Sequence, residues 1–101
     1  MQGNDNLLSN AVRSGQTVLV DFWAPWCSPC SQLSPIIDRV SAKLSGRCSV
    51  IKMDIDTTSS HRSLGIQSVP TLVLFKGGQV VWKHEGLISE AALTNALARF
   101  C

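Results

Sequence analysis

Two cysteines separated by two residues are the clearest candidates for chemistry in this chain. Cys27 and Cys30 close the segment VDFWAPWCSPC, which also carries an acidic residue, Asp21, in a mostly apolar run. Two thiols at this spacing can form a disulfide and exchange it with other disulfides. Attack by Cys27 on a substrate disulfide gives a mixed disulfide, which Cys30 then resolves. The motif therefore predicts thiol–disulfide exchange.

A zinc site and two inert buried cysteines are the alternatives for this pair. One Cys-x-x-Cys motif supplies half of a tetrahedral zinc site. The other cysteines, Cys48 and Cys101, are isolated in the sequence, and the two histidines lack ligand spacing. Tryptophans and prolines next to the motif are unusual for simple packing. In a β–α–β context the motif favours redox chemistry over metal binding.

The composition restricts the class of protein. The chain has 101 residues, a net charge of +2 and 45% hydrophobic residues, which is ordinary for a single folded domain over residues 1–101. Lys and Arg are scattered, so no nucleic-acid partner is expected. No apolar stretch reaches the length of a membrane span, and the N-terminus does not resemble a signal peptide. We therefore expect a cytoplasmic monomer with no membrane or nucleic-acid partner.

Hydrophobic periodicity predicts an α/β fold. Apolar residues recur at helical spacing in three segments: about 4–14, 28–44 and 89–100. Asn4 and Asp5 are candidate N-caps of the first helix. Apolar and β-branched runs mark four strands: about 17–23, 48–54, 71–76 and 80–84. Gly77–Gly78 indicates a hairpin between the last two strands, and the polar segment 57–68 is expected to hold one helical turn.

These elements define a mixed β-sheet with helices on both faces. Strands joined by a helix are parallel, with a right-handed crossover, whereas the terminal hairpin adds antiparallel strands. The expected order across the sheet is 48–54, 17–23, 71–76 and 80–84. Cys27 and Cys30 then lie where a buried strand ends and a helix begins, and free N–H groups there stabilise a thiolate. Pro29 stiffens the segment between them.

Motifs along the whole chain resemble the thioredoxin family. The matching segments keep the family's order and spacing from about Leu7 to the C-terminus: VDFWAPWCSPC, Pro35, IKMDID, SVPTLVLFKGG and HEGLIS. The resemblance implies a thioredoxin-like fold and the reduction of protein disulfides. It also implies recharging by a flavoprotein thioredoxin reductase at the expense of NADPH. NADPH and FAD would belong to that partner, and this chain would need no metal and no cofactor beyond its own disulfide.

The same resemblance assigns roles to residues around the cysteines. It makes Asp21 the general base for Cys30, since a carboxylate in apolar surroundings has a raised pKa. An Asp that is simply satisfied by hydrogen bonds is the alternative. Lys52 matches the family's lysine near that carboxylate, or is an exposed lysine at a strand end. Trp23 is expected to pack beneath the site.

Further matches imply a rim where substrate docks. The segment SVPT matches the family's cis-proline loop, in which Pro70 packs against the disulfide and Val69 is presented to the substrate backbone. A trans proline at a strand start is the alternative. Other residues that fit the family's apolar rim are Trp26, Ala24 and Gly86.

The chain departs from the family pattern in three places. About four residues precede the first helix, too few for the strand with which the family usually begins, so we expect four strands. Ser28 lies at the position where the commonest form of the motif has Gly, and this difference is expected to alter the redox potential of the cysteine pair. Cys48 and Cys101 lie outside the site. We expect Cys48 to be inert at the start of a buried strand, and Cys101 to be exposed and able to form dimers on oxidation.

The sequence therefore predicts a protein-disulfide oxidoreductase of thioredoxin type, acting with thioredoxin reductase and with disulfide-containing protein substrates. Three alternatives stay open. The first is a dedicated redox partner of one enzyme, and the second is a weaker reductant or oxidant of the disulfide-isomerase type. The third is a docking subunit whose redox activity is incidental.

Overall fold

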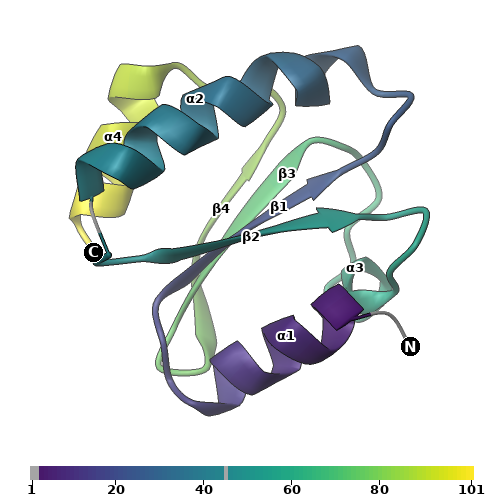
Figure 1. Cartoon of the computed structure of the whole chain (residues 1–101), viewed down its shortest axis with the longest axis horizontal. Helices are drawn as coiled ribbons and strands as arrows, with labels where there is room; N and C mark the ends of the chain where they lie inside the picture. The colour runs from purple at the N-terminus through teal and green to yellow at the C-terminus, as the bar shows by residue number, and fades with distance from the viewer. Residues whose placement is uncertain (1–2, 45) are drawn as a thin grey trace.

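A four-stranded mixed β-sheet forms the centre of the molecule, with helices on both of its faces (Figure 1). The structure is a computed structural model that describes residues 3–44 and 46–101. In chain order the elements are α1 (Gly3–Arg13), β1 (Val18–Trp23), α2 (Ser28–Leu44), β2 (Ser49–Asp54), α3 (Ser60–Ser63), β3 (Thr71–Lys76), β4 (Gln79–Glu85) and α4 (Glu90–Ala98).

The sheet has the order expected from the sequence, β2–β1–β3–β4. β1 runs parallel to β2 and antiparallel to β3, and β3 and β4 form an antiparallel hairpin. Gly77 and Gly78 make its turn with φ angles of 61° and 81°, a left-handed conformation that other residues rarely adopt. Residues 3–6 form no strand, as expected, but are already helical, and residues 1 and 2 lie outside the described part of the chain.

Two apolar clusters attach the helices to the two faces of β1. Val18, Val20 and Phe22 point into the cluster that includes residues of α1. Leu19 points to the opposite face, into the cluster built with α2 and α4. The buried side chains that these two helices contribute to it are Leu33, Ile37, Val40, Leu44, Leu93 and Leu97. Because β1 is buried on both faces, its C-terminal end and the residues that follow are firmly positioned.

The expectation that Asn4 or Asp5 caps the first helix is wrong, because both residues lie inside α1. Their side chains bind other elements instead. Asn4 Nδ2 donates to the carbonyl oxygen of Lys52 at 2.9 Å. The Asp5 carboxylate is buried and accepts hydrogen bonds from the N–H groups of Ser59 and Ser60 and from Ser60 Oγ. Asp5 therefore fastens α1 to the start of α3.

We predict that Asp5→Ala lowers the free energy of unfolding by about 1–3 kcal/mol at pH 7, because two part-buried N–H donors lose a charged acceptor. Urea unfolding measures the change. Asn4→Ala is the matched control, since it removes an exposed hydrogen bond from the same turn and is expected to cost less than about 0.5 kcal/mol. Equal stability of Asp5→Ala and the wild type at pH 7 would contradict the assignment.

The contribution of Asp5 should also depend on pH. Burial raises the pKa of this carboxyl, but the hydrogen bonds from Ser60 and Ser59 together lower it by more, so the pKa lies below 3.8 in the folded protein. A lowered pKa gives stability that is present above about pH 4 and is lost as the pH falls through the folded-state value. The difference between the wild type and Asp5→Ala should therefore shrink in urea titrations below that pH.

Candidate active site

Cys27 and Cys30 lie at the junction between β1 and α2. β1 ends at Trp23 and α2 begins at Ser28, and between them Cys27 N donates to Ala24 O at 3.2 Å. The two cysteines form a disulfide, with 5.3 Å between their Cα atoms. Both are buried. A buried strand that leads directly into a helix thus holds both sulfurs at the edge of the core.

The first turn of α2 places N–H groups around the sulfur of Cys27. Cys30 N donates to Cys27 Sγ at 3.3 Å. Helix N-termini also have N–H groups without helical acceptors and the positive end of the helix dipole. Both features stabilise negative charge on a thiol that lies there. Pro29, in the same turn, is exposed.

Asp21 is a buried carboxyl group in the middle of β1. It is 1% exposed, and no described group donates a hydrogen bond to its Oδ1. Burial raises the pKa of this carboxyl, the positive charge of Lys52 lowers it, and the negative charge of Asp38 raises it, giving a pKa of about 6. Asp21 therefore exchanges its proton close to neutral pH.

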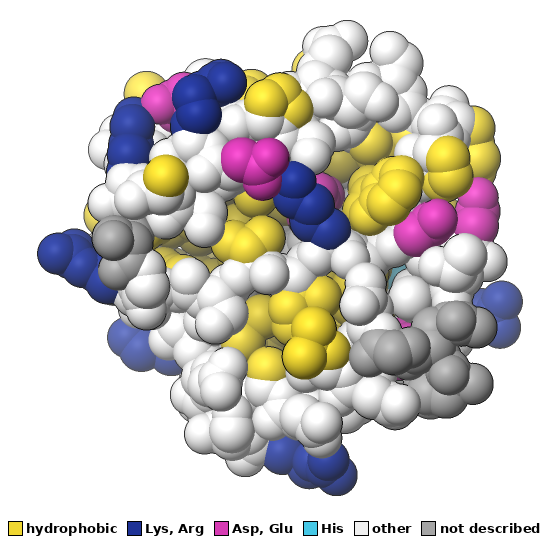
Figure 2. All heavy atoms as spheres, in the orientation of Figure 1, with side chains coloured by type: hydrophobic (Ala, Val, Ile, Leu, Met, Phe, Trp, Pro, Cys, Tyr) yellow, Lys and Arg dark blue, Asp and Glu magenta, His cyan; other side chains and the backbone are white. Residues whose placement is uncertain are grey.

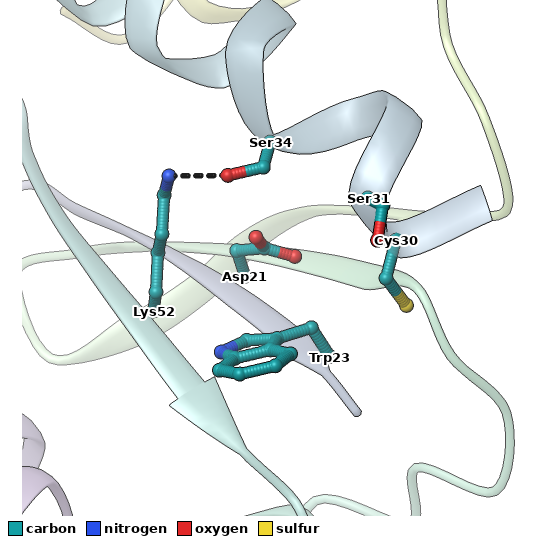
Figure 3. Close-up of a pocket in the computed structure, with 6 residues that line it drawn as sticks. All are labelled: Asp21, Trp23, Cys30, Ser31, Ser34 and Lys52. Atoms are coloured by element: carbon teal, nitrogen blue, oxygen red, sulfur yellow. Dashed lines mark hydrogen bonds between the residues drawn. The ribbon is translucent and has the colours of Figure 1, made fainter. Parts of the chain in front are cut away.

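A cavity of about 250 Å³ is lined by both Asp21 and Cys30. Its walls come from β1, β2 and α2, and the lining residues are Asp21, Trp23, Cys30, Ser31, Ser34 and Lys52. Figure 3 shows the Asp21 carboxylate pointing from β1 toward α2, with the Trp23 ring next to it and Cys30 in the first turn of α2. A titrating carboxyl group and one of the two sulfurs therefore face the same confined space.

The ammonium group of Lys52 lies in this cavity but is bound by α2. Nζ donates to Ser34 Oγ at 2.7 Å and to Asp38 Oδ1 at 2.8 Å (Figure 3 shows the first bond). Lys52 therefore influences Asp21 as a nearby charge. Sequence reasoning found Lys52 but missed Ser34 and Asp38. Their i, i+4 spacing on a helix that follows the active-site strand was the available signal, because such residues share a helix face.

Trp26 is an exposed aromatic residue next to the disulfide. It is 68% exposed, and its Nε1 donates to Asp56 Oδ2 at 3.1 Å, a partner that sequence reasoning missed. Figure 2 shows hydrophobic side chains gathered beside acidic ones at the end of the molecule where β1 leads into α2. Ala24 does not belong to this rim, contrary to expectation. It is 2% exposed, because it packs directly against Cys27 and Cys30.

The loop before β3 lies on the other side of the disulfide. The peptide bond between Val69 and Pro70 is cis, as the resemblance implies, and Val69 packs against the two cysteines. Pro70 is buried, and its carbonyl oxygen accepts a hydrogen bond from Gly86 N at 2.9 Å. This loop, Gly86 and the disulfide are thus held together at one end of the sheet.

Cys48 and Cys101 look isolated in the sequence, but the fold brings them together. They form a second disulfide, with 5.6 Å between their Cα atoms, and both are half-buried. The expectations of an inert Cys48 and an exposed Cys101 are therefore wrong. The physical reason is the packing of α4 beside α2, which carries the residues after α4 to the start of β2.

Two further features, a metal site and a membrane-spanning helix, are absent from residues 3–44 and 46–101. No group of three His, Cys, Asp or Glu side chains in these ranges is arranged to hold a metal ion. None of the described helices is both long enough and apolar enough to span a membrane.

Comparison with known proteins identifies the family. The thioredoxin family model matches residues 2–99. The chain is 42% identical over 84 residues to a thioredoxin from Synechocystis sp., covering 82% of this chain and 78% of that protein. It is 38% identical over 88 residues to a thioredoxin from Haemophilus influenzae, covering 86% and 82% of the two chains.

Two further comparisons concern the fold and a fused relative. The structure of a mutant thioredoxin from Halobacterium salinarum superposes with a TM-score of 0.82 at 33% identity, covering 92% of this chain and 81% of that one. This similarity confirms the expected thioredoxin-like fold. A bifunctional thioredoxin reductase/thioredoxin from Mycobacterium leprae is 35% identical over 94 residues, which make up 92% of this chain and 20% of that protein. With its family-model match, its relatives and its paired cysteines at the start of α2, the chain belongs to the thioredoxin family of protein-disulfide oxidoreductases.

Proposed function

We propose that this protein reduces protein disulfides through Cys27 and Cys30 in the cytoplasm, and that a thioredoxin reductase restores the dithiol with electrons from NADPH. The observation that carries the proposal is the position of the disulfide, at the start of α2 and on a cavity that also holds Asp21. The name of the Mycobacterium leprae relative, which joins a thioredoxin reductase to a thioredoxin, supports the choice of partner. NADPH and FAD stay with the reductase.

The first half of the reaction uses Cys27 as the nucleophile. In the reduced protein its thiolate attacks one sulfur of the substrate disulfide, and the other substrate sulfur leaves as a thiolate. The N–H of Cys30, which donates to Cys27 Sγ in the oxidised state, supports the negative charge before attack. The product is a mixed disulfide between Cys27 and the substrate.

The second half uses Cys30 as the resolving thiol and Asp21 as its base. Asp21 takes the thiol proton through the shared cavity, and the Cys30 thiolate then attacks Cys27 Sγ. The second substrate sulfur leaves as a thiolate, so the substrate has gained two electrons and the protein has formed its disulfide. A pKa of about 6 makes Asp21 mostly ionised at pH 7 and able to return the proton when the disulfide is reopened.

Substrate recognition is assigned to the rim around the disulfide. The exposed indole of Trp26 offers an apolar surface, and its bond to Asp56 fixes the ring. Val69, Pro70 and Gly86 line the opposite side, where an extended segment of substrate would lie along the loop before β3. Lys52 supports the site through its charge, and Pro29 through the stiffness of the active-site turn.

The activity test is insulin reduction coupled to NADPH and a thioredoxin reductase from the same source. The wild type should turn over and Cys27→Ser should fall to the background rate, because no mixed disulfide can form at position 27. Cys101→Ser, which removes one half of the second disulfide and lies outside the site, should keep the wild-type rate. Full activity of Cys27→Ser would eliminate the mechanism. Partner binding without any reduction by the wild type would instead identify a docking subunit.

We predict that Asp21→Asn slows resolution of the mixed disulfide while leaving the first attack by Cys27 nearly unchanged. The loss should be roughly ten- to a hundredfold near pH 7 and should shrink at high pH, where Cys30 ionises unaided. Single-turnover kinetics from pH 6 to 9 separate the two steps. Asp38→Asn is the comparison variant. It removes an exposed carboxylate that acts on Asp21 only through charge, so it should slow resolution much less than Asp21→Asn does. If Asp21→Asn resolves the mixed disulfide at the wild-type rate at every pH, Asp21 has only a structural role.

The same substitution should also change how stability depends on pH. The pKa of Asp21 rises from 3.8 to about 6 on folding, so the folded protein holds this proton more tightly than the unfolded chain does. Ionisation therefore costs stability as the pH rises from about 4 through about 6. In the oxidised protein, the stability of Asp21→Asn relative to the wild type should increase by roughly 2 kcal/mol between pH 4 and pH 8. Urea unfolding at the two pH values measures it, and a constant difference would exclude a raised pKa.

A further inference from the structure

Cys48 and Cys101 form a second sulfur pair that the disulfide exchange at Cys27 and Cys30 does not use. Their Cα atoms are 5.6 Å apart, within the range that a disulfide bridges without backbone movement. Figure 1 shows the end of the chain next to the start of β2, close to the last turn of α2. We propose that this pair is a second redox couple, whose oxidised form fastens α4 to β2 and stabilises the fold.

The two couples lie at opposite ends of α2. Cys27 directly precedes this helix, whereas Cys48 comes after its last residue, Leu44. A helix of 17 residues is roughly 25 Å long at a rise of about 1.5 Å per residue. Thiol–disulfide exchange requires contact between sulfurs, so the two pairs cannot exchange within one molecule. The second couple is therefore oxidised and reduced by other molecules.

Packing holds both cysteines in place independently of the bond. Cys101 N donates to Leu97 O at 2.9 Å, and Ser49 N, next to Cys48, donates to Thr17 O at 3.0 Å. Both cysteines pack against the apolar cluster built by β1, β3, α2 and α4. The folded chain thus presents the two thiols to each other at a high effective concentration, which favours closure over separate reactions.

The bond restrains a helix that has few other attachments. α4 has nine residues and two buried side chains, Leu93 and Leu97. Its first residue, Glu90, pairs with Arg39 and Lys43 of α2, but these ion pairs are largely exposed and contribute little. The disulfide joins residues 53 positions apart, so it removes much of the freedom of the unfolded chain and ties down the other end of α4.

The oxidant is a small disulfide such as glutathione disulfide, because half-buried cysteines are accessible to a small molecule. The thiolate of one cysteine attacks a glutathione sulfur and expels one glutathione thiolate. The second cysteine attacks the resulting mixed disulfide at the protein sulfur and expels the other. The protein gives up two electrons and two protons, and glutathione disulfide becomes two molecules of glutathione.

The test uses the full chain with Cys27→Ser and Cys30→Ser, which leaves only Cys48 and Cys101 as thiols. The reduced protein is incubated with glutathione disulfide and then examined by thiol titration, peptide mass mapping and thermal unfolding. We expect both thiols to disappear, a peptide link between positions 48 and 101 with no bound glutathione, and a Tm about 10 °C or more above that of the reduced protein. Persistent thiols, stable glutathione adducts, a disulfide-linked dimer or an unchanged Tm would overturn the proposal.

The control in the same background is Cys48→Ala. Cys101 then lacks its partner and should retain glutathione or form dimers, with no rise in Tm. If these variants fail to fold, peptide mapping of the wild type after incubation with glutathione disulfide shows whether positions 48 and 101 are linked. An absent link would overturn the proposal.

The outcome does not depend on the proposed function, because the test protein lacks both active-site thiols. The double variant Cys48→Ala, Cys101→Ala with an intact active site should still reduce insulin at the wild-type rate at 25 °C. A loss of that activity in a folded double variant would show that the two couples are not independent.

Discussion

The rest of the site depends on one buried carboxyl group. It lies in a strand whose two faces are both covered by helices. Asp21 is 1% exposed, and Lys52 offsets its charge only from a distance, because α2 binds that ammonium group. Burial destabilises the ionised form of this carboxyl group and so raises its pKa to about 6. The packing that imposes this cost also closes the cavity shared with Cys30. The acid–base chemistry of the site and the architecture of the sheet therefore have one physical origin.

Apolar runs and helical periodicity were sufficient to predict the first three strands and the three long helices, because these elements bury apolar side chains. β4 is mostly exposed and was predicted from the Gly77–Gly78 hairpin signal. The hairpin turn could also be predicted, since it depends on adjacent residues. The caps expected at Asn4 and Asp5 failed for the opposite reason. Their partners lie about fifty residues away, and local sequence carries no sign of them.

The same distinction applies to the site. Cys27, Cys30 and Asp21 stand within ten residues of one another, so the end of one strand and the start of one helix were enough to place them together. Ser34, Asp38 and Asp56 bind side chains from other elements, and Cys48 meets Cys101 only because α4 packs beside α2. These pairings depend on how elements are rotated against each other. The sequence gives only a partial sign of this, in the i, i+4 spacing of Ser34 and Asp38 on one helix face.

In the described part of the chain, β2 has a strand neighbour on one side only. The free side of such a strand presents backbone groups to which strands of other molecules can add, which is a common route to aggregation. Here the side chain of Asn4, from α1, donates a hydrogen bond to the carbonyl oxygen of Lys52 on β2. Fraying of the first helix would release that contact and expose more of the strand. The hydrogen bond from α1 therefore also limits how much of this sheet edge another strand could pair with.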